Sequence, residues 1–189
     1  TQEGKNVAVC AVVGNFDDAQ TGVKNIFAAA VDGKLPGGNR CRLSTANSIN
    51  IGRLAPQITY YFKAYADLLA RGQIKMGDKV NFCVPTGNFG DILAGWLAKQ
   101  LGLPVGKLIC ASNANNVLTD FLQTGTYDRR RPLHKTASPS MDILVSSNLE
   151  RLLYFVSKDT ELVASLMKQL NTEGFYTVPA QLKAQMDEE

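Results

Sequence analysis

The stretch VPTGNFGDILAG, residues 84–95, decides the fold. It begins in an apolar run at 79–84 that has the composition of a strand, passes through a polar turn with two glycines, and continues from Asp91 as an apolar helix. A second β-rich run at 105–111 and a second helical segment near 117–123 follow. Strands that alternate with helices pair in parallel through right-handed crossovers. The sequence therefore predicts an α/β fold with an open, twisted, mostly parallel sheet and flanking helices.

The neighbouring segments extend this pattern. Residues 6–13, NVAVCAVV, are rich in β-branched residues and predict a buried strand, and a helix is expected from Asp17 to about Val31. Glycine and proline cluster at 32–40, which predicts a boundary between a first domain, 1–36, and a second domain, 37–189.

The rest of the second domain is expected to be largely helical. Apolar residues three or four positions apart predict one long amphipathic helix from 51 to about 71, capped by Asn47 or Ser48. Further helices are expected at 149–156, 160–170 and 180–186, and an irregular segment is expected between 125 and 140.

Composition excludes several classes of protein. The chain has 189 residues, 45% of them hydrophobic, and a formal net charge of +3, which is too small to indicate a nucleic-acid or membrane-surface partner. No run approaches the ~18 apolar residues of a membrane span. The four cysteines have no metal-site or redox-motif spacing, so no metal site is expected, and free thiols favour a cytoplasmic location.

Two similar loops, GNFDD at 14–18 and GNFGD at 87–91, each join an expected strand to an expected helix. Unpaired N–H groups at a helix start favour an anion. Two carboxylates stand at the first loop, and one like-charged pair at ~4 Å costs about 4 kcal/mol at an effective dielectric near 20. The loop from Gly87 to Gly90 is therefore the better cradle for a phosphate. A tight turn without a ligand remains the alternative on these residues alone.

Four motifs together identify a family. Residues 84–95 resemble the cofactor-phosphate loop of bacterial threonine synthases, and GNFDDAQ at 14–20, ANSIN at 46–50 and PSMDI at 139–143 resemble further motifs of that family in the same order. The resemblance covers most of residues 6–154. It implies part of the large domain of a fold type II pyridoxal-phosphate enzyme, with a strand and helix from a smaller domain at 1–36.

The resemblance also implies a reaction and its site. Threonine synthases convert O-phospho-L-homoserine and water to L-threonine and phosphate with pyridoxal phosphate. By this resemblance, the cofactor-binding loop of the family corresponds to Gly87, Asn88, Phe89, Gly90 and Asp91. The substrate-binding side of the family's active site corresponds to Asn47, Ser48, Asn50 and Arg53. The alternative role of these residues is capping, packing or an ordinary salt bridge.

One departure from the family concerns catalysis. The lysine that forms a Schiff base with the cofactor lies in a Phe-Lys-Asp context in this family, and no lysine here has that context: Lys63 follows Phe62 but precedes Ala64. We therefore expect no catalytic residue in this sequence, expect it to be a piece of a longer protein, and expect it to be inactive by itself.

Two other functions stay open. A threonine-synthase-like phospho-lyase would share these motifs, and a free-standing module that binds a phosphorylated metabolite would need no lysine. In each case the expected partner is a small phosphorylated molecule, with no nucleic acid and no membrane, and an unpaired strand edge predicts self-association. We interpret His134 as a surface loop residue and Trp96 as a packing residue.

Overall fold

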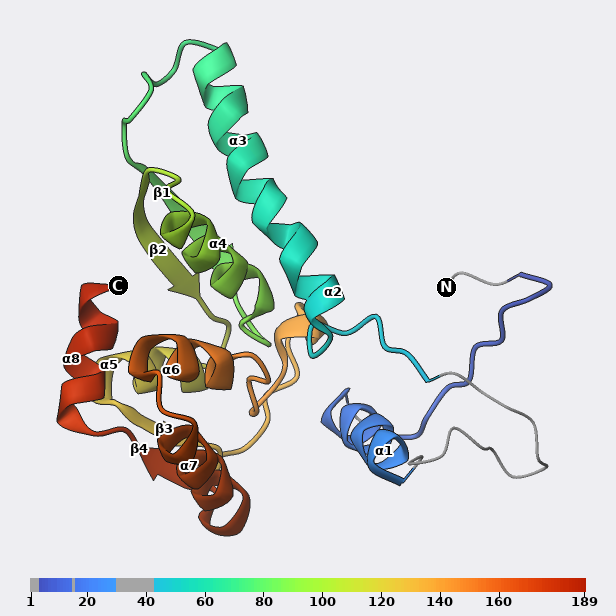
Figure 1. Ribbon diagram of the computed structural model, residues 1–189. Helices are drawn as coiled ribbons and strands as arrows, with labels where there is room; N and C mark the ends of the chain where they lie inside the picture. Colours follow the sequence, from blue (N-terminus) through green and yellow to red (C-terminus); the bar gives the residue numbers. More distant parts are fainter. Residues whose placement is uncertain (1–3, 15, 30–42) are drawn as a thin grey trace. The chain divides into compact units, whose positions relative to one another are not determined.

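The computed structural model describes residues 4–14, 16–29 and 43–189 (Figure 1). The chain divides into two compact units, Thr1–Ser44 and Thr45–Glu189. The predicted boundary at 32–40 lies outside the described residues and stays a prediction. Within the described part, no helix is long and apolar enough to cross a membrane.

The first unit contains the helix α1, Phe16–Ala29, which confirms the helix expected from Asp17. The buried strand expected at 6–13 is wrong: residues 4–14 form one isolated bridge, between Gly4 and Val7, and no strand. Val12 and Val13 are 65% and 104% exposed. A strand needs a neighbour to accept its backbone hydrogen bonds, and the described residues offer this run none.

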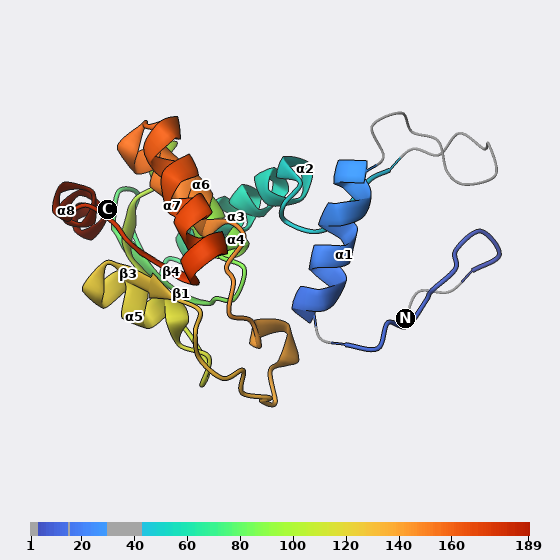
Figure 2. The same cartoon turned by 90° about the horizontal axis from the view of Figure 1, so that it is seen from below.

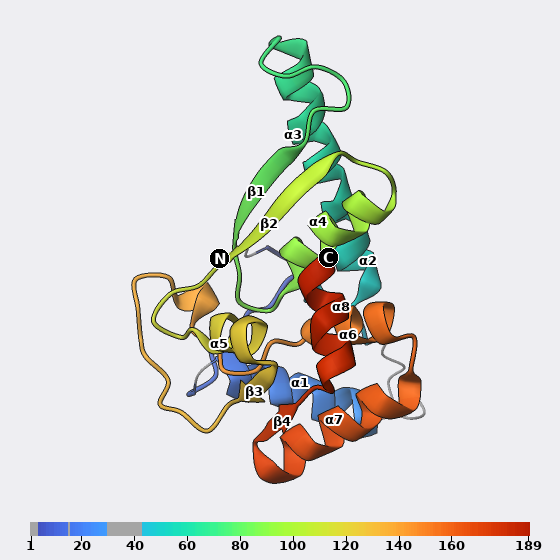
Figure 3. The same ribbon diagram turned by 90° about the vertical axis from the view of Figure 1, so that its left-hand side faces the viewer.

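The second unit contains the predicted parallel pair. Strand β1, Val80–Pro85, leads through a short loop to helix α4, Gly90–Gln100, and then to strand β2, Val105–Ala111. The two strands pair in parallel, with Val84 opposite Cys110 and Pro85 opposite Ala111 (Figure 3). The α/β fold class predicted from residues 84–95 is thereby confirmed.

The long helix expected from residue 51 is interrupted. Helix α2, Ile51–Leu54, passes into a 3-10 turn, Ala55–Gln57, before helix α3, Ile58–Ala70. Pro56 lacks an N–H and its ring cannot sit inside a regular helix, which explains the tighter turn. The cap is Asn50, whose side chain accepts from the N–H of Gly52, so the expected caps Asn47 and Ser48 are wrong.

A second, smaller sheet was missed. Strands β3, Thr126–Asp128, and β4, Phe175–Thr177, pair antiparallel. They lie 47 residues apart in the sequence and have three residues each, too few for a period to be visible. The expected irregular segment therefore contains a strand, and also a 3-10 turn at Pro139–Met141.

Four helices complete this unit, and all four were expected with ends within three residues (Figure 2). They are α5, Val117–Thr124; α6, Leu149–Ser157; α7, Thr160–Glu173; and α8, Ala180–Glu188.

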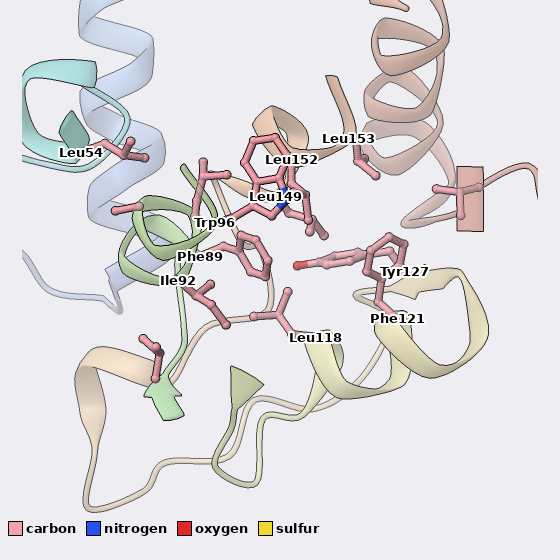
Figure 4. Packing of buried hydrophobic residues seen from close by; sticks show 14 of the residues in the cluster. Leu54, Phe89, Ile92, Trp96, Leu118, Phe121, Tyr127, Leu149, Leu152 and Leu153 are labelled. Atoms are coloured by element: carbon pink, nitrogen blue, oxygen red, sulfur yellow. The ribbon is translucent and has the colours of Figure 1, made fainter. Parts of the chain in front are cut away.

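One apolar core joins these elements. Figure 4 shows Phe89 and Trp96 from the α4 region facing leucines of α6, with Phe121 and Tyr127 beside them. The ring of Tyr127 stacks on that of Tyr176 with centroids 5.4 Å apart, which ties β3 to β4 at the base of the core. The loop between β1 and α4 is thus attached to a packed body on its Phe89 side.

The cysteines that the structure describes are more exposed than the apolar residues next to them in the sequence would indicate. Cys10 and Cys83 are exposed, and Cys110 is partly buried. Burial raises the pKa of the Cys110 thiol. Cys83 alternates with the buried Val84 along β1, so its side chain lies on the uncovered face of the two-stranded sheet.

Candidate functional site

The candidate site is the loop from Thr86 to Phe89 and the start of α4. Phe89 precedes the helix in a left-handed conformation, with φ 62° and ψ 6°. A non-glycine residue in this region is strained and persists only where its surroundings hold it. The ring of Phe89 is buried against Ile92 and Trp96 of α4 and against α6, and this packing holds the backbone in place (Figure 4).

Most N–H groups of this loop donate to no acceptor among the described residues. The N–H of Thr86 donates to the carbonyl of Ala111, and that of Leu93 donates to the carbonyl of Phe89. Between them, the N–H groups of residues 87–92 donate to no residue that the structure describes, and the first five of these, 87–91, belong to the predicted loop. Five neighbouring donors at a helix start, with the positive end of the helix dipole, form a site for an anion.

A cavity of about 400 Å³ lies against these donors. Arg53 and Asp91 are the charged side chains among its lining residues. Arg53 is exposed and forms no ion pair with any described residue, whereas Gln57 has a buried side-chain oxygen without a hydrogen-bond partner. The remaining lining residues are Ser48, Pro85, Thr86, Gly87, Asn88, Phe89, Gly90, Ile92 and Ser140.

The four residues predicted on the substrate side divide into two pairs. Ser48 and Arg53 line the cavity beside the loop. Asn47 and Asn50 are instead used within their own turn: the side chain of Asn47 accepts from the N–H of Ile49, at 3.1 Å, and that of Asn50 caps α2. The geometry thus brings two of the four residues to the cavity.

The two glycines of the loop are required by protein contacts. A Cβ on Gly90 would lie 2.9 Å from Cβ of Ser48, and one on Gly87 would lie 3.3 Å from the backbone of both Ser140 and Met141. Glycine at these positions therefore lets two distant segments approach the loop. The nearest neighbour of Gly90 is thus Ser48.

Asp91 is held by α3. The hydroxyl of Tyr61 donates to the backbone carbonyl of Asp91, at 2.8 Å, and lies 3.3 Å from its carboxylate. Burial, together with the charge of Asp91, raises the pKa of Tyr61 well above its usual range. Tyr61 therefore remains a neutral donor at any physiological pH.

A segment that sequence reasoning missed supports the loop from behind. Ser146 and Asn148 donate to its carbonyls, Arg151 donates to Asn148 and Ser48, and Asn148 is fully buried. The sequence signal was weak, because a run of two serines and an asparagine before a helix also fits an ordinary cap.

Other residues singled out in the sequence lie elsewhere. His134 is exposed in an irregular segment, as predicted. Trp96 stacks on Phe155 of α6, with centroids 5.6 Å apart, and its indole N–H donates to Glu189. Within the described residues, no group of three or more His, Cys, Asp or Glu side chains could hold a metal ion.

Comparisons with known proteins identify relatives. No family model matches the chain. It is 49% identical over 170 residues to threonine synthase-like 1 of Macaca fascicularis, which covers 88% of this chain and 23% of that protein. It is 45% identical over 179 residues to threonine synthase of Pseudomonas aeruginosa, covering 94% of this chain and 36% of that protein. The crystal structure of pyridoxal-phosphate-bound threonine synthase from Brucella melitensis aligns with a TM-score of 0.75 and 40% identity, over 94% of this chain and 36% of that one. The chain thus spans between a quarter and about a third of these relatives.

Proposed function

We propose that this chain supplies the site for the cofactor phosphate in a threonine synthase. The chain belongs to the threonine synthase family over nearly its whole length. The enzyme would convert O-phospho-L-homoserine and water to L-threonine and phosphate. The observation that carries the proposal is that residues 87–91 line a cavity while their N–H groups donate to no acceptor among the described residues.

The residues fit a phosphate ester of a small aromatic aldehyde. Five bare donors suit the phosphate oxygens, and the orphaned side-chain oxygen of Gln57 offers an acceptor for a ligand donor. Gly87, Asn88, Phe89, Gly90 and Asp91 would hold the phosphate through their backbone. Pyridoxal phosphate, when bound, supplies an electron sink for carbanion chemistry. The part of this chain is to bind and orient that group.

Ser48 and Arg53 would face the substrate. Arg53 lines the cavity and has no ion pair among the described residues. A phosphorylated amino acid carries anionic groups, and a guanidinium binds such groups through bidentate hydrogen bonds. The catalytic lysine expected in the family has no counterpart in this sequence, so we propose that the chain by itself does not turn over substrate. A cytoplasmic location and self-association remain predictions.

Two alternatives have specific support. Similarity to threonine synthase-like 1 fits a phospho-lyase that acts on a related phosphorylated amino acid. A non-catalytic module that binds a phosphorylated metabolite fits the bare donors equally well, because they require only an anion.

A chimera separates these functions. The matching segment of the Pseudomonas aeruginosa enzyme is replaced by this chain, and the product is assayed with O-phospho-L-homoserine for both phosphate and threonine. Equal release of the two supports threonine synthase. Release of phosphate without threonine supports the phospho-lyase. A folded chimera that binds pyridoxal phosphate but releases neither supports the binding module and contradicts the main proposal.

A further inference from the structure

The carbonyl groups of the anion loop are held by one segment behind it. The hydroxyl of Ser146 donates to the carbonyl of Gly87 at 2.8 Å. The carbonyl of Asn88 accepts both the backbone N–H of Asn148, at 3.1 Å, and its side-chain amide, at 2.9 Å. Three donors from residues 146–148 therefore fix the direction of two consecutive carbonyls.

This fixes the direction of the facing N–H groups as well. In a planar trans peptide the C=O and the next N–H point in opposite directions, and the described residues contain no cis peptide. With the carbonyls of Gly87 and Asn88 turned toward Ser146 and Asn148, the N–H groups of Asn88 and Phe89 must point away from that segment. These are two of the five bare donors.

We infer that Ser146 and Asn148 are positioning residues that set the anion-binding orientation of the loop and join it to Ser48. The inference rests on the proposed function, because it concerns the same site. Ser146 and Asn148 are buried and do not line the cavity, so they would act on a bound anion only through the backbone of the loop.

Asn148 makes the connection to Ser48. Its side-chain amide also donates to the hydroxyl of Ser48, at 2.7 Å, and its side-chain oxygen accepts from the guanidinium of Arg151. Arg151 in turn donates to the carbonyls of Ser48 and Ile49, at 2.6 and 2.5 Å. One fully buried asparagine thus connects the proposed phosphate side and the proposed substrate side of the cavity.

Tyr127 anchors the segment to the second sheet. Its hydroxyl accepts from the N–H of Ser146, at 2.8 Å, and donates to the carbonyl of Leu144, at 2.9 Å. The support therefore runs from β3 through Tyr127 and Ser146 to the loop.

The orientation needs such support. Neighbouring N–H groups without acceptors repel one another, and Phe89 holds a strained backbone conformation. A peptide rotated without its ties would present a carbonyl oxygen to the anion, which repels it. Ser146 and Asn148 hold the donors in place before a ligand arrives, so that binding requires no reorganisation.

The test compares binding of pyridoxine 5′-phosphate and pyridoxine to the full chain by titration calorimetry. Neither compound has an aldehyde, so the lysines of the chain cannot react with them. The variant Ser146→Ala removes the donor to Gly87, and Ser146→Thr keeps a hydroxyl. Tyr65→Phe is the matched control, because it removes another buried hydroxyl that donates to a backbone carbonyl, that of Asp78, away from the loop.

We expect Ser146→Ala to weaken binding of pyridoxine 5′-phosphate about tenfold, the factor that one lost hydrogen bond gives, with no change for pyridoxine. Ser146→Thr should restore the affinity and Tyr65→Phe should keep it. Unchanged affinity in Ser146→Ala overturns the inference even if its melting temperature falls. If Ser146→Ala does not fold, Tyr127→Phe is measured instead. We expect it to weaken the binding of pyridoxine 5′-phosphate by a smaller factor, and an unchanged affinity would contradict the inference. A wild-type chain that does not prefer the phosphorylated compound overturns the proposed function itself.

Discussion

Gly90 and Ser48 approach so closely that a β-carbon on Gly90 would lie 2.9 Å from that of Ser48 and 3.1 Å from its hydroxyl. The start of α4 and the segment before α2 therefore touch across 42 residues of sequence. Through this contact the loop at 87–91, proposed to hold a phosphate, and a residue on the predicted substrate side line the same cavity.

Gly90→Ala is expected to separate the two segments. The added methyl group overlaps Ser48, and overpacking of this kind costs about 1–3 kcal/mol. We expect a lower free energy of unfolding in urea and a weaker affinity for pyridoxine 5′-phosphate, measured by calorimetry. Adding Ser48→Gly removes the overlap but also the hydrogen bond from Asn148 to the Ser48 hydroxyl, so it should recover part of the stability.

The matched control for this substitution is Gly22→Ala in α1. A Cβ there meets no atom of the described residues within 4 Å, and alanine is favoured over glycine inside a helix. That variant should be at least as stable as the wild type. Equal effects of the two substitutions would show that the contact with Ser48 does not constrain Gly90.

Gly95→Ala tests packing alone. A β-carbon on Gly95 would lie 2.6 Å from the ring of Tyr61, which is 4% exposed and cannot move aside. We expect a loss of about 1–3 kcal/mol in the free energy of unfolding. The double variant with Tyr61→Leu frees the space and should be more stable than Gly95→Ala alone, and a double variant that is less stable would contradict this packing.

Asp142 predicts a dependence of stability on pH. Hydrogen bonds from the backbone N–H and the hydroxyl of Thr136, with Asn113 and Asn115, hold the pKa of its carboxyl below the usual 3.8. A carboxyl with a lowered pKa in the folded state stabilises the protein above its unfolded pKa, and this contribution is lost as the pH falls through the folded pKa. Asp142 directly follows Ser140 and Met141, whose backbone packs on Gly87, so these hydrogen bonds also hold that segment in place.

The variant Asp142→Asn is therefore expected to be less stable than the wild type at pH 7. The difference in the free energy of unfolding should shrink as the pH falls below about 4, where the wild type loses the same contribution. Urea denaturation at pH 7, 4 and 3 measures it. A difference that stays constant across these values would show that the charge of Asp142 is not responsible.

The sequence predicted the elements with strong local signals and missed those that depend on distant partners. Residues 80–111 show a regular change of period and were placed to within a residue or two. Strands β3 and β4 have three residues each and stabilise one another across a long gap. The apolar run at 6–13 has strand composition but no partner among the described residues, so composition alone gave a wrong result.

The site shows the same division. The loop at 87–91 could be singled out as a candidate because glycine, chain turn and helix start are adjacent in sequence. Asn148 could not, because its role depends on the approach of Asn88 and Ser48, which are 60 and 100 residues away. Asn47 and Asn50 illustrate the reverse case, since their polar side chains are used by their own turn.

Arg53 is predicted to matter for substrate and not for stability. It is exposed and lines the cavity without an ion pair among described residues. In the chimera, Arg53→Ala is expected to raise KM for O-phospho-L-homoserine about tenfold, as the loss of a charge-assisted contact predicts, with an unchanged melting temperature. Arg71→Ala, another exposed arginine, is the control. Equal kinetics of the two variants would remove Arg53 from the site.

The outer edges of β1 and β2 predict self-association. Neither strand has a second neighbour among the described residues, and Ile109 of β2 is 47% exposed. Unpaired edges with exposed apolar side chains favour pairing between copies. Light scattering should show oligomers that grow with concentration and that Ile109→Lys reduces. A clean monomer at millimolar concentration would contradict the prediction.

The most direct measurement follows the backbone amide resonances of the full chain by ¹H–¹⁵N NMR during addition of pyridoxine 5′-phosphate. A phosphate held by the start of α4 predicts that the amide protons of Asn88, Phe89 and Gly90 move downfield together at one dissociation constant, and that pyridoxine without phosphate leaves them in place. Shifts confined to surface lysines, with the resonances of residues 87–91 unchanged, would contradict the account.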